Sequence, residues 1–179
     1  INKLQPSMIW LESPTNPLLK ILDLKKICDK AKENQIPVVV DNTFSTALLQ
    51  RPLDLGATLS LTSTTKYING HSDALGGAVC TQDIYWKDRM NFAQKALGLQ
   101  PSPFDCWLIT RGIKTLPLRL SRQVENALAL ANELGTHPAV AWARYPFKSD
   151  HPQYELAKKQ MKSGGAIITV KLKADQKQT

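Results

Sequence analysis

The chain has 179 residues, 42% of them hydrophobic and 21% charged, so it is long enough to build one ordinary domain and too apolar to stay disordered. Its apolar runs span only a few residues, far short of the roughly 20 that cross a bilayer, and residues 1–4 do not begin like a signal peptide, so we expect a cytoplasmic protein with no membrane partner. A net charge of +8 raises the hypothesis of nucleic-acid binding, but the basic residues are scattered. The one dense group, Lys158, Lys159 and Lys162, is typical of a solvated helix face, so we expect no nucleic-acid partner.

The cysteines and histidines do not form a recognisable ligand set. The three cysteines are odd in number and widely spaced, which favours reduced, buried thiols over a disulfide framework or a zinc site: Cys28, Cys80 and Cys106. The three histidines also lack the spacing of metal ligands. We therefore expect no bound metal.

The first part of the chain predicts a strand, a helix and a strand. Residues 8–11 are apolar and are followed by the two-proline segment 12–17, which indicates a buried strand and a shaped loop in which either X-Pro bond can be cis. Apolar residues at helical spacing over 24–31, preceded by Asp23 as a cap, predict an amphipathic helix. Residues 36–40 are apolar and mostly β-branched, as in an interior parallel strand, and Asp41 is expected just after its end. Because ligands gather at the carboxyl ends of such strands, Asp41 and the 12–17 loop should face one crevice.

The rest of the chain predicts a second, smaller part. We expect strands at 58–61 and 76–80, a helix at 84–97, a loop at 98–103, a long helix over 120–134 stopped by Gly135, a strand at 139–145, a helix at 151–161 and a strand at 166–173, with polar, aperiodic residues at 174–179. The long helix should link two parts of the molecule. Because a sheet that ends on one exposed strand is incomplete, we expect further sequence downstream, which could also balance the positive charge.

Five residues could together hold pyridoxal phosphate. A lysine can bind this aldehyde cofactor as an imine and a carboxylate can keep its pyridine nitrogen protonated, and Lys66 and Asp41 are the candidates. Ser63 and Thr65 could donate hydroxyls to the phosphate, and Asn16 could reach the ring oxygen from the facing loop. Read alone, each has a plainer interpretation: a surface lysine, a turn aspartate, a loop-forming asparagine. Their joint occurrence is what favours the cofactor.

Lys66 would have two tasks at such a site. It would first hold the cofactor, and after displacement by the substrate amine it would shuttle a proton next to the reacting carbons. The second task needs an uncharged amine for part of the cycle, which we expect burial and a nearby cation to favour.

Five ordered segments, distributed over most of the chain, resemble one enzyme family: 12–17, 40–44, 63–73, 101–106 and 111–116. The resemblance is to the transsulfuration enzymes of the Cys/Met metabolism family, which includes the cystathionine γ-synthases, γ-lyases and β-lyases. It implies the type I fold of pyridoxal phosphate enzymes, a three-layer α/β/α large domain with a mostly parallel sheet, followed by a small α+β domain. Residues 1–113 would belong to the large domain, 114–136 would be the linking helix and 137–179 would start the small domain, where 151–157 resembles its first segment.

The resemblance also implies roles for the candidate residues. Lys66 matches the Schiff-base lysine, Asp41 the partner of the pyridinium, Ser63 and Thr65 the phosphate-binding hydroxyls and Asn16 the contact to the ring oxygen. It implies a small amino-acid substrate and a homotetramer.

Residues 69–73 resemble γ-synthases and γ-lyases more than O-acetylhomoserine sulfhydrylases, and reaction at the γ-carbon is the leading hypothesis. Cystathionine β-lyase, methionine γ-lyase and a piece without catalytic activity remain alternatives. The last is open because family members carry a phosphate loop and a stacking tyrosine before the stretch matching Ile1, and a carboxylate-binding arginine beyond Thr179.

Overall fold

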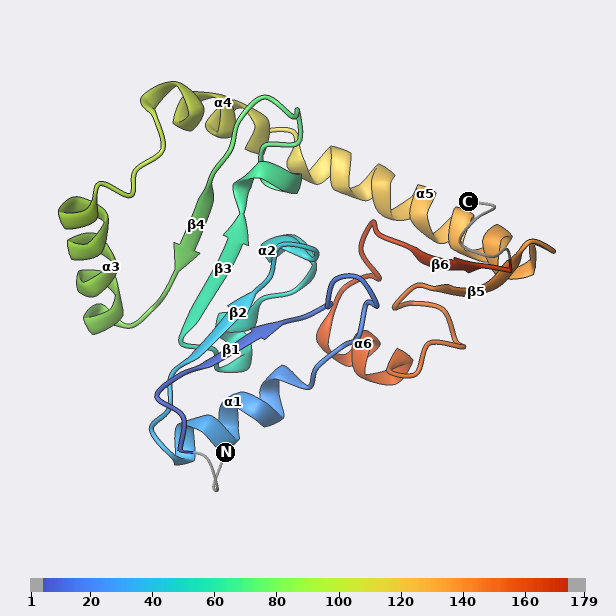
Figure 1. The fold of residues 1–179 in the computed structure, drawn as a ribbon, viewed down its shortest axis with the longest axis horizontal. Helices are drawn as coiled ribbons and strands as arrows, with labels where there is room; N and C mark the ends of the chain where they lie inside the picture. The colour runs from blue at the N-terminus through green and yellow to red at the C-terminus, as the bar shows by residue number, and fades with distance from the viewer. Residues whose placement is uncertain (1–4, 174–179) are drawn as a thin grey trace.

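A computed structural model describes residues 5–173, so the sequence expectations for 1–4 and 174–179 lie outside the described residues. The described chain forms these elements in order: β1 (Ile9–Glu12), α1 (Leu24–Glu33), β2 (Val38–Asp41), α2 (Thr46–Leu49), a 3₁₀ turn (Pro52–Leu55), β3 (Leu59–Ser63), a π-type turn (Thr64–Ile68), β4 (Gly77–Cys80), α3 (Ile84–Leu97), α4 (Pro103–Ile113), α5 (Leu116–Thr136), β5 (Val140–Arg144), α6 (Tyr154–Gln160) and β6 (Thr169–Leu172) (Figure 1). We call Thr64–Ile68 the lysine turn, because it carries Lys66.

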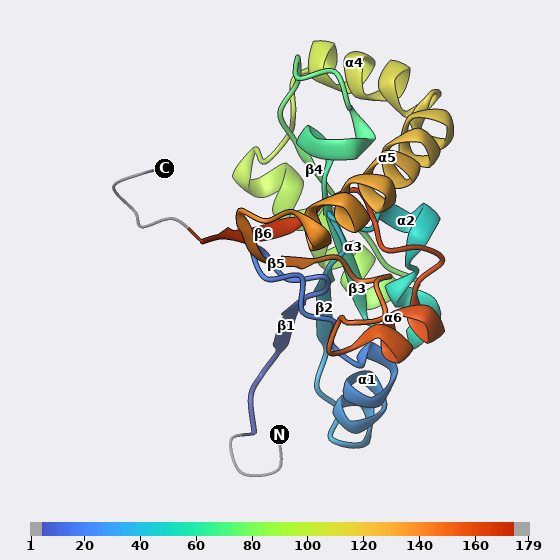
Figure 2. The same cartoon turned by 90° about the vertical axis from the view of Figure 1, so that its right-hand side faces the viewer.

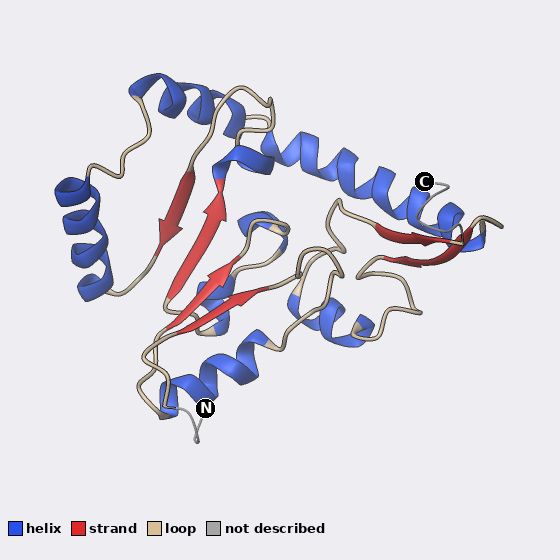
Figure 3. Cartoon of the chain, viewed as in Figure 1, coloured by secondary structure: helices blue, strands red, loops and turns tan. Residues whose placement is uncertain are grey.

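The main sheet has the order β1-β2-β3-β4 (Figure 3). β2 pairs in parallel with both β1 and β3, whereas β4 runs antiparallel to β3. The expected α/β class with a mostly parallel sheet is therefore confirmed, and 36–40 does supply an interior strand. Asp41 is the last residue of β2, whereas the sequence placed it just after the end of the strand. It pairs with Glu12 of β1 and Leu61 of β3. This register brings the carboxyl ends of three strands to one edge.

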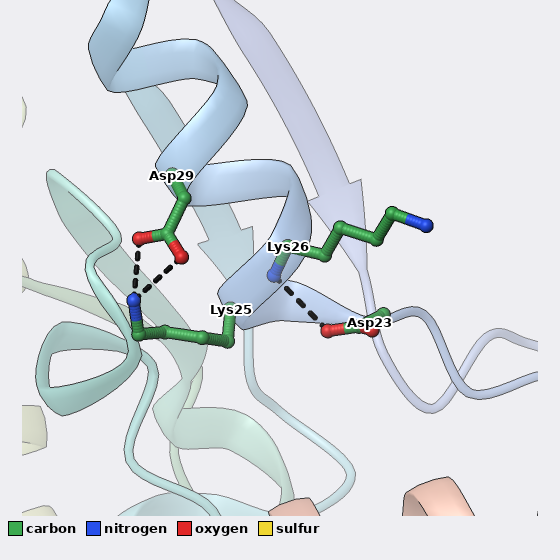
Figure 4. Close-up of polar contacts among 4 residues, drawn as sticks. All are labelled: Asp23, Lys25, Lys26 and Asp29. Atoms are coloured by element: carbon green, nitrogen blue, oxygen red, sulfur yellow. Dashed lines mark hydrogen bonds and ion pairs between the residues drawn. The ribbon is translucent and has the colours of Figure 1, made fainter.

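Helix α1 covers one face of this sheet. Asp23 caps it as predicted, because its Oδ1 accepts a hydrogen bond from the Lys26 backbone N–H at 3.0 Å (Figure 4). Its buried residues Leu24, Cys28 and Ala31 form one cluster with Val38 and Val40 of β2 and with Ala57, which precedes β3. Burying a side chain such as Leu24 contributes about 1.5–3 kcal/mol, whereas the exposed Lys25–Asp29 ion pair seen in Figure 4 contributes about 1 kcal/mol or less.

Two helix boundaries differ from the sequence expectation. The expected stop at Gly135 is wrong, because α5 continues to Thr136 and ends at His137, which has the extended backbone that a following proline favours. The predicted loop over 98–103 is confirmed for residues 98–102, and Pro103 begins α4, a helix that the sequence reading missed. Its start signal is nevertheless present: Ser102 Oγ accepts from the Asp105 N–H at 3.0 Å, and proline occupies the first helical position.

The expectation of three buried thiols is correct for one cysteine only. All three are free; Cys28 is buried in α1, and this burial raises the pKa of its thiol to about 11. Cys80 and Cys106 are exposed. They lie on the edge strand β4 and on α4, where few residues of the described chain cover them.

The last part of the chain forms a separate small sheet. β5 and β6 pair antiparallel, and α5 packs against β5 (Figure 2). Tyr145, just after β5, is 1% exposed and donates its hydroxyl to the Gly165 carbonyl at 2.9 Å. We keep the division into 1–113, 114–136 and 137–179 as a proposal, supported by the length of α5 and by this second sheet. Within residues 5–173, no helix is long and apolar enough to span a membrane.

Candidate active site

The candidate residues lie where β1, β2 and β3 end. Asp41 is the last residue of β2, Ser63 is the last residue of β3, and the lysine turn follows directly. Asn16 lies four residues after the end of β1. The crevice edge predicted from the sequence is therefore the edge at which three neighbouring strand ends meet.

Thr43 joins the ends of β2 and β3, and the sequence reading missed this role. Its backbone N–H donates to Asp41 Oδ1 at 2.9 Å, the two-residue turn that aspartate side chains commonly form. Its Oγ1 accepts from the Ser63 N–H at 2.8 Å. Thr43 is buried, with 8% of its surface exposed. The bond at Oδ1 fixes the orientation of the Asp41 carboxylate. The feature of the sequence that could have indicated this role is the position of Thr43, two residues after Asp41.

The lysine turn is irregular at Lys66 itself. The Asn69 N–H donates to the Thr64 carbonyl at 2.9 Å, an i→i+5 bond, and the Gly70 N–H donates to the Lys66 carbonyl at 2.8 Å. Between these bonds Lys66 has non-helical dihedral angles, φ −89° and ψ −118°. Thr64 and Asn69 are buried on either side, but Lys66 is exposed. The expected burial of Lys66 is therefore wrong, because the turn anchors its flanking residues and directs Lys66 outward.

Thr65 is bound to the start of β4. Its Oγ1 accepts from the Gly76 N–H at 3.0 Å and donates to the Gly76 carbonyl at 3.3 Å. The donor contact is the longer of the two, so the hydroxyl proton can turn to an anion while the Gly76 N–H keeps the oxygen in place. The sequence did not indicate that Gly76 would be the hydrogen-bond partner of Thr65.

Asn16 lies on the opposite loop and is exposed. Its backbone N–H donates to Glu12 Oε2 at 3.0 Å, which ties the loop to the last residue of β1. Ser13 and Pro14 are buried beneath it. The Ser13–Pro14 and Asn16–Pro17 peptide bonds are both cis, which answers the question that the sequence left open.

A cleft of about 770 Å³ opens beside Lys66. It extends toward α5 and the segment before β6, with Thr65, Lys66, Arg119 and Ile167 among its lining residues. Its volume is within the range of small-molecule sites. The structure thus brings Thr65 and Lys66 to the cleft, whereas Asn16, Asp41 and Ser63 are not among its lining residues and lie at the neighbouring strand ends.

Two tyrosines stay uncharged at neutral pH: Tyr67, which is half-buried in the lysine turn, and Tyr145, which is buried. Burial raises the pKa of Tyr67, which directly follows Lys66. Burial, and then the nearby Tyr67, raise the pKa of Tyr145 to about 12. Neither phenol can therefore serve as an anionic base near pH 7.

An α/β fold with a crevice at its strand ends is a common setting for ligand and cofactor sites. The chain belongs to the Cys/Met metabolism PLP-dependent enzyme family, whose model matches residues 1–179. The resemblance seen in the five sequence segments is confirmed.

The curated relatives carry out related reactions. The chain is 48% identical over 166 residues to a probable cystathionine gamma-synthase of Herpetosiphon aurantiacus, an alignment that covers 93% of this chain and 52% of that protein. It is 47% identical over 173 residues to a cystathionine beta-lyase of Coxiella burnetii, covering 96% of this chain and 45% of the relative. The chain thus spans about half the length of the curated relatives it matches.

Solved structures share the fold. Cystathionine gamma synthase from Xanthomonas oryzae pv. oryzae, in complex with aminoacrylate and cysteine, matches with a TM-score of 0.94 and 44% identity over 97% of this chain and 45% of that one. A methionine gamma lyase from Micromonospora echinospora matches with a TM-score of 0.93 and 41% identity over 94% of this chain and 46% of that one.

Proposed function

We propose that this chain forms the cofactor-binding part of a pyridoxal phosphate enzyme that acts at the γ-carbon of sulfur amino acids, as a cystathionine γ-synthase or γ-lyase. The observation that carries the proposal is the strand edge itself: Thr43 hydrogen-bonds to both Asp41 and Ser63, and the lysine turn follows Ser63 directly. An amine, a carboxylate and hydroxyls are the groups that this cofactor requires.

Each candidate residue has a separate role in this proposal. Lys66 Nζ would hold the cofactor as an imine, and the Asp41 carboxylate would accept a hydrogen bond from its protonated ring nitrogen. Ser63 and Thr65 donate to the phosphate, with Thr65 oriented by the Gly76 N–H at 3.0 Å, and Asn16 contacts the ring oxygen from the facing loop. When bound, pyridoxal phosphate acts as an electron sink for amino-acid substrates.

Lys66 has a second role as the proton carrier. Once the substrate amine has replaced it, Nζ takes the proton from the substrate α-carbon and returns a proton later in the cycle. The place of Lys66 on the cleft supports this role, since a substrate bound there can reach the amine.

The substrate class follows from the family and from the γ-type residues 69–73. Relatives named cystathionine gamma-synthase and gamma-lyase are 43–48% identical to this chain. β-Elimination is the second candidate, because the Coxiella burnetii β-lyase is 47% identical. Products separate them: a γ-lyase releases cysteine and 2-oxobutanoate from cystathionine, a β-lyase releases homocysteine and pyruvate, and a γ-synthase makes cystathionine from cysteine and an O-acylhomoserine.

A tetrameric assembly and a cytoplasmic location remain predictions.

The first experiment is trapping of the cofactor on the lysine. The complete gene product that contains this sequence is mixed with pyridoxal phosphate and reduced with borohydride, and the modified peptide is identified by mass mapping. We expect stoichiometric label on Lys66, none in a Lys66→Arg variant and unchanged label in Lys114→Arg, which alters another exposed lysine. Label scattered over surface lysines, or absent from Lys66, would contradict the proposal.

A further inference from the structure

Arg119 makes a dense set of hydrogen bonds beside the candidate site. It lies in the first turn of α5, about 50 residues after the lysine turn, and is half-buried. Its guanidinium donates from Nη1 to the Tyr67 carbonyl at 3.0 Å, and from Nη2 to the carbonyls of Ile68 at 3.4 Å and Gly112 at 3.0 Å. Its Nε donates to Thr115 Oγ1 at 3.0 Å. Every nitrogen of the side chain therefore has an acceptor.

Two of these acceptors, the carbonyls of Tyr67 and Ile68, lie at the end of the lysine turn. The backbone N–H groups of Asn69 and Gly70 bind the carbonyls of Thr64 and Lys66, and Arg119 binds the next two carbonyls. The Gly112 carbonyl belongs to the last turn of α4. A cation at the carboxyl ends of two helical segments is favoured electrostatically as well as by hydrogen bonding. Arg119 thus fixes the end of the turn that follows Lys66 and joins it to α4.

Two glycines leave the space that this arrangement needs. A Cβ on Gly70, whose φ is +72°, would lie 2.0 Å from Arg119 Nη1. A Cβ on Gly112 would lie 2.2 Å from the Asn69 carbonyl oxygen. The guanidinium and α4 therefore approach the lysine turn closely only because both positions lack a side chain.

We propose that Arg119 is a positioning residue for Lys66. This inference rests on the proposed function: Arg119 holds the carbonyls of Tyr67 and Ile68 so that Lys66, on the same cleft, keeps the conformation in which its amine attaches the cofactor. The planar fork of an arginine spreads five donors over three nitrogens in a fixed geometry, whereas a lysine has three donors on one nitrogen and cannot reach the same set of carbonyls. The phosphate contact should depend less on Arg119, because Thr65 is held by Gly76 instead.

The test compares covalent attachment with binding that needs no lysine. Arg119→Lys and Arg119→Gln are made in the complete gene product, with Arg122→Lys and Arg122→Gln as controls; Arg122 is an exposed arginine on the same helix, paired with Glu125. One measurement is the rate at which pyridoxal phosphate becomes trapped on Lys66 by borohydride. The other is the affinity for pyridoxine 5′-phosphate, which keeps the ring and phosphate but has an alcohol in place of the aldehyde. Amide exchange of Gly70 reports on the turn without any cofactor.

We expect both Arg119 variants to slow attachment about tenfold, as for loss of one charge-assisted hydrogen bond, and to speed exchange of the Gly70 amide. Affinity for pyridoxine 5′-phosphate should change less than about twofold, and the Arg122 variants should match the unmodified protein. Unchanged attachment, or an equal loss of attachment and pyridoxine 5′-phosphate affinity, overturns the role of Arg119. If the unmodified protein is not labelled on Lys66, the proposed function itself fails and this role fails with it.

Discussion

The lysine turn and the 12–17 loop form the two sides of the candidate site, and different later parts of the chain support them. The lysine turn is held by Arg119 and by Gly112 of α4. The 12–17 loop and the segment after it are held instead by Gln50 and α6. Gln50 Nε2 donates to the Ser13 carbonyl at 2.7 Å, and α6 supports the segment that follows the loop. The two sides should therefore be separable by mutation, because α4 with α5 governs one and α6 governs the other.

The largest effect is expected from Gly112→Ala, which disturbs the turn side. The added Cβ would lie 2.2 Å from the Asn69 oxygen and 3.0 Å from its carbonyl carbon, both backbone atoms, so α4 must move. We expect the free energy of unfolding to fall by about 2–3 kcal/mol, as in overpacked cores. Urea denaturation measures it.

Gly135→Ala is the matched control, since it is another glycine inside a helix. Its Cβ would meet only Lys148 Nζ, the mobile end of a long side chain, at 2.4 Å. We expect a gain of about 0.5–1 kcal/mol from helix propensity. Equal stability of the two variants would show that the approach of α4 to the lysine turn is not a tight contact.

Gln160→Ala should disturb the loop side alone. Gln160 Nε2 donates to the Leu22 carbonyl at 3.0 Å and to Gln50 Oε1 at 2.9 Å, and its Oε1 accepts from the Leu24 N–H at 2.9 Å. Losing these bonds leaves partly buried groups without partners, and we expect a loss of about 2 kcal/mol.

Amide exchange locates the effect of this substitution. The Leu24 amide should exchange faster in Gln160→Ala, whereas the Gly70 amide of the turn side should be unaffected. Lys159→Ala, an exposed neighbour on α6, should change neither. Faster exchange at Gly70 in Gln160→Ala would refute the separation of the two sides.

The sequence revealed the local features of both sides and missed the contacts between them. Helix α1 could be predicted because its cap, Asp23, and its buried stripe lie within a few residues of one another. The candidate residues Asp41 and Lys66 could be found because one lies at the end of a strand and the other just after one. Arg119 could not, since its partners Tyr67 and Ile68 are about 50 residues away and no local pattern indicates the contact. The exposure of Lys66 was missed for the same reason: it depends on which flanking residues the fold buries.

Thr43→Val probes the junction where β2 meets β3. Valine keeps the shape of threonine but removes the acceptor of the Ser63 N–H, which is 2.8 Å from Thr43 Oγ1. We expect the free energy of unfolding to fall by about 1–2 kcal/mol and pyridoxine 5′-phosphate to bind more weakly, because Ser63 loses its fixed position. Thr43→Ser keeps the acceptor and should retain affinity in a ligand titration. Weakened binding in the serine variant but not in the valine variant would contradict the role of this hydroxyl.

The smallest expected effect is a pH dependence of the loop side through His151. His151 is 5% exposed; its Nδ1 accepts from the Gln153 N–H at 3.1 Å, so Nε2 carries the hydrogen and donates to the Leu19 carbonyl at 3.1 Å. Burial lowers the pKa of His151, with Arg144 adding to this and the Leu19 carbonyl and Asp150 opposing it. The folded state therefore prefers the neutral ring.

It follows that this contribution to stability is fully present above the unfolded pKa of about 6.5 and is lost as the pH falls through the lower folded value. Protonation of Nδ1 also removes the acceptor of the Gln153 N–H, which loosens the start of α6. Urea denaturation between about pH 5 and pH 8 should show stability rising with pH, and His151→Gln should flatten that rise. The exposed His137, changed to glutamine, is the control and should leave it intact. If the rise persists in His151→Gln, another group is responsible and His151 does not couple the start of α6 to Leu19.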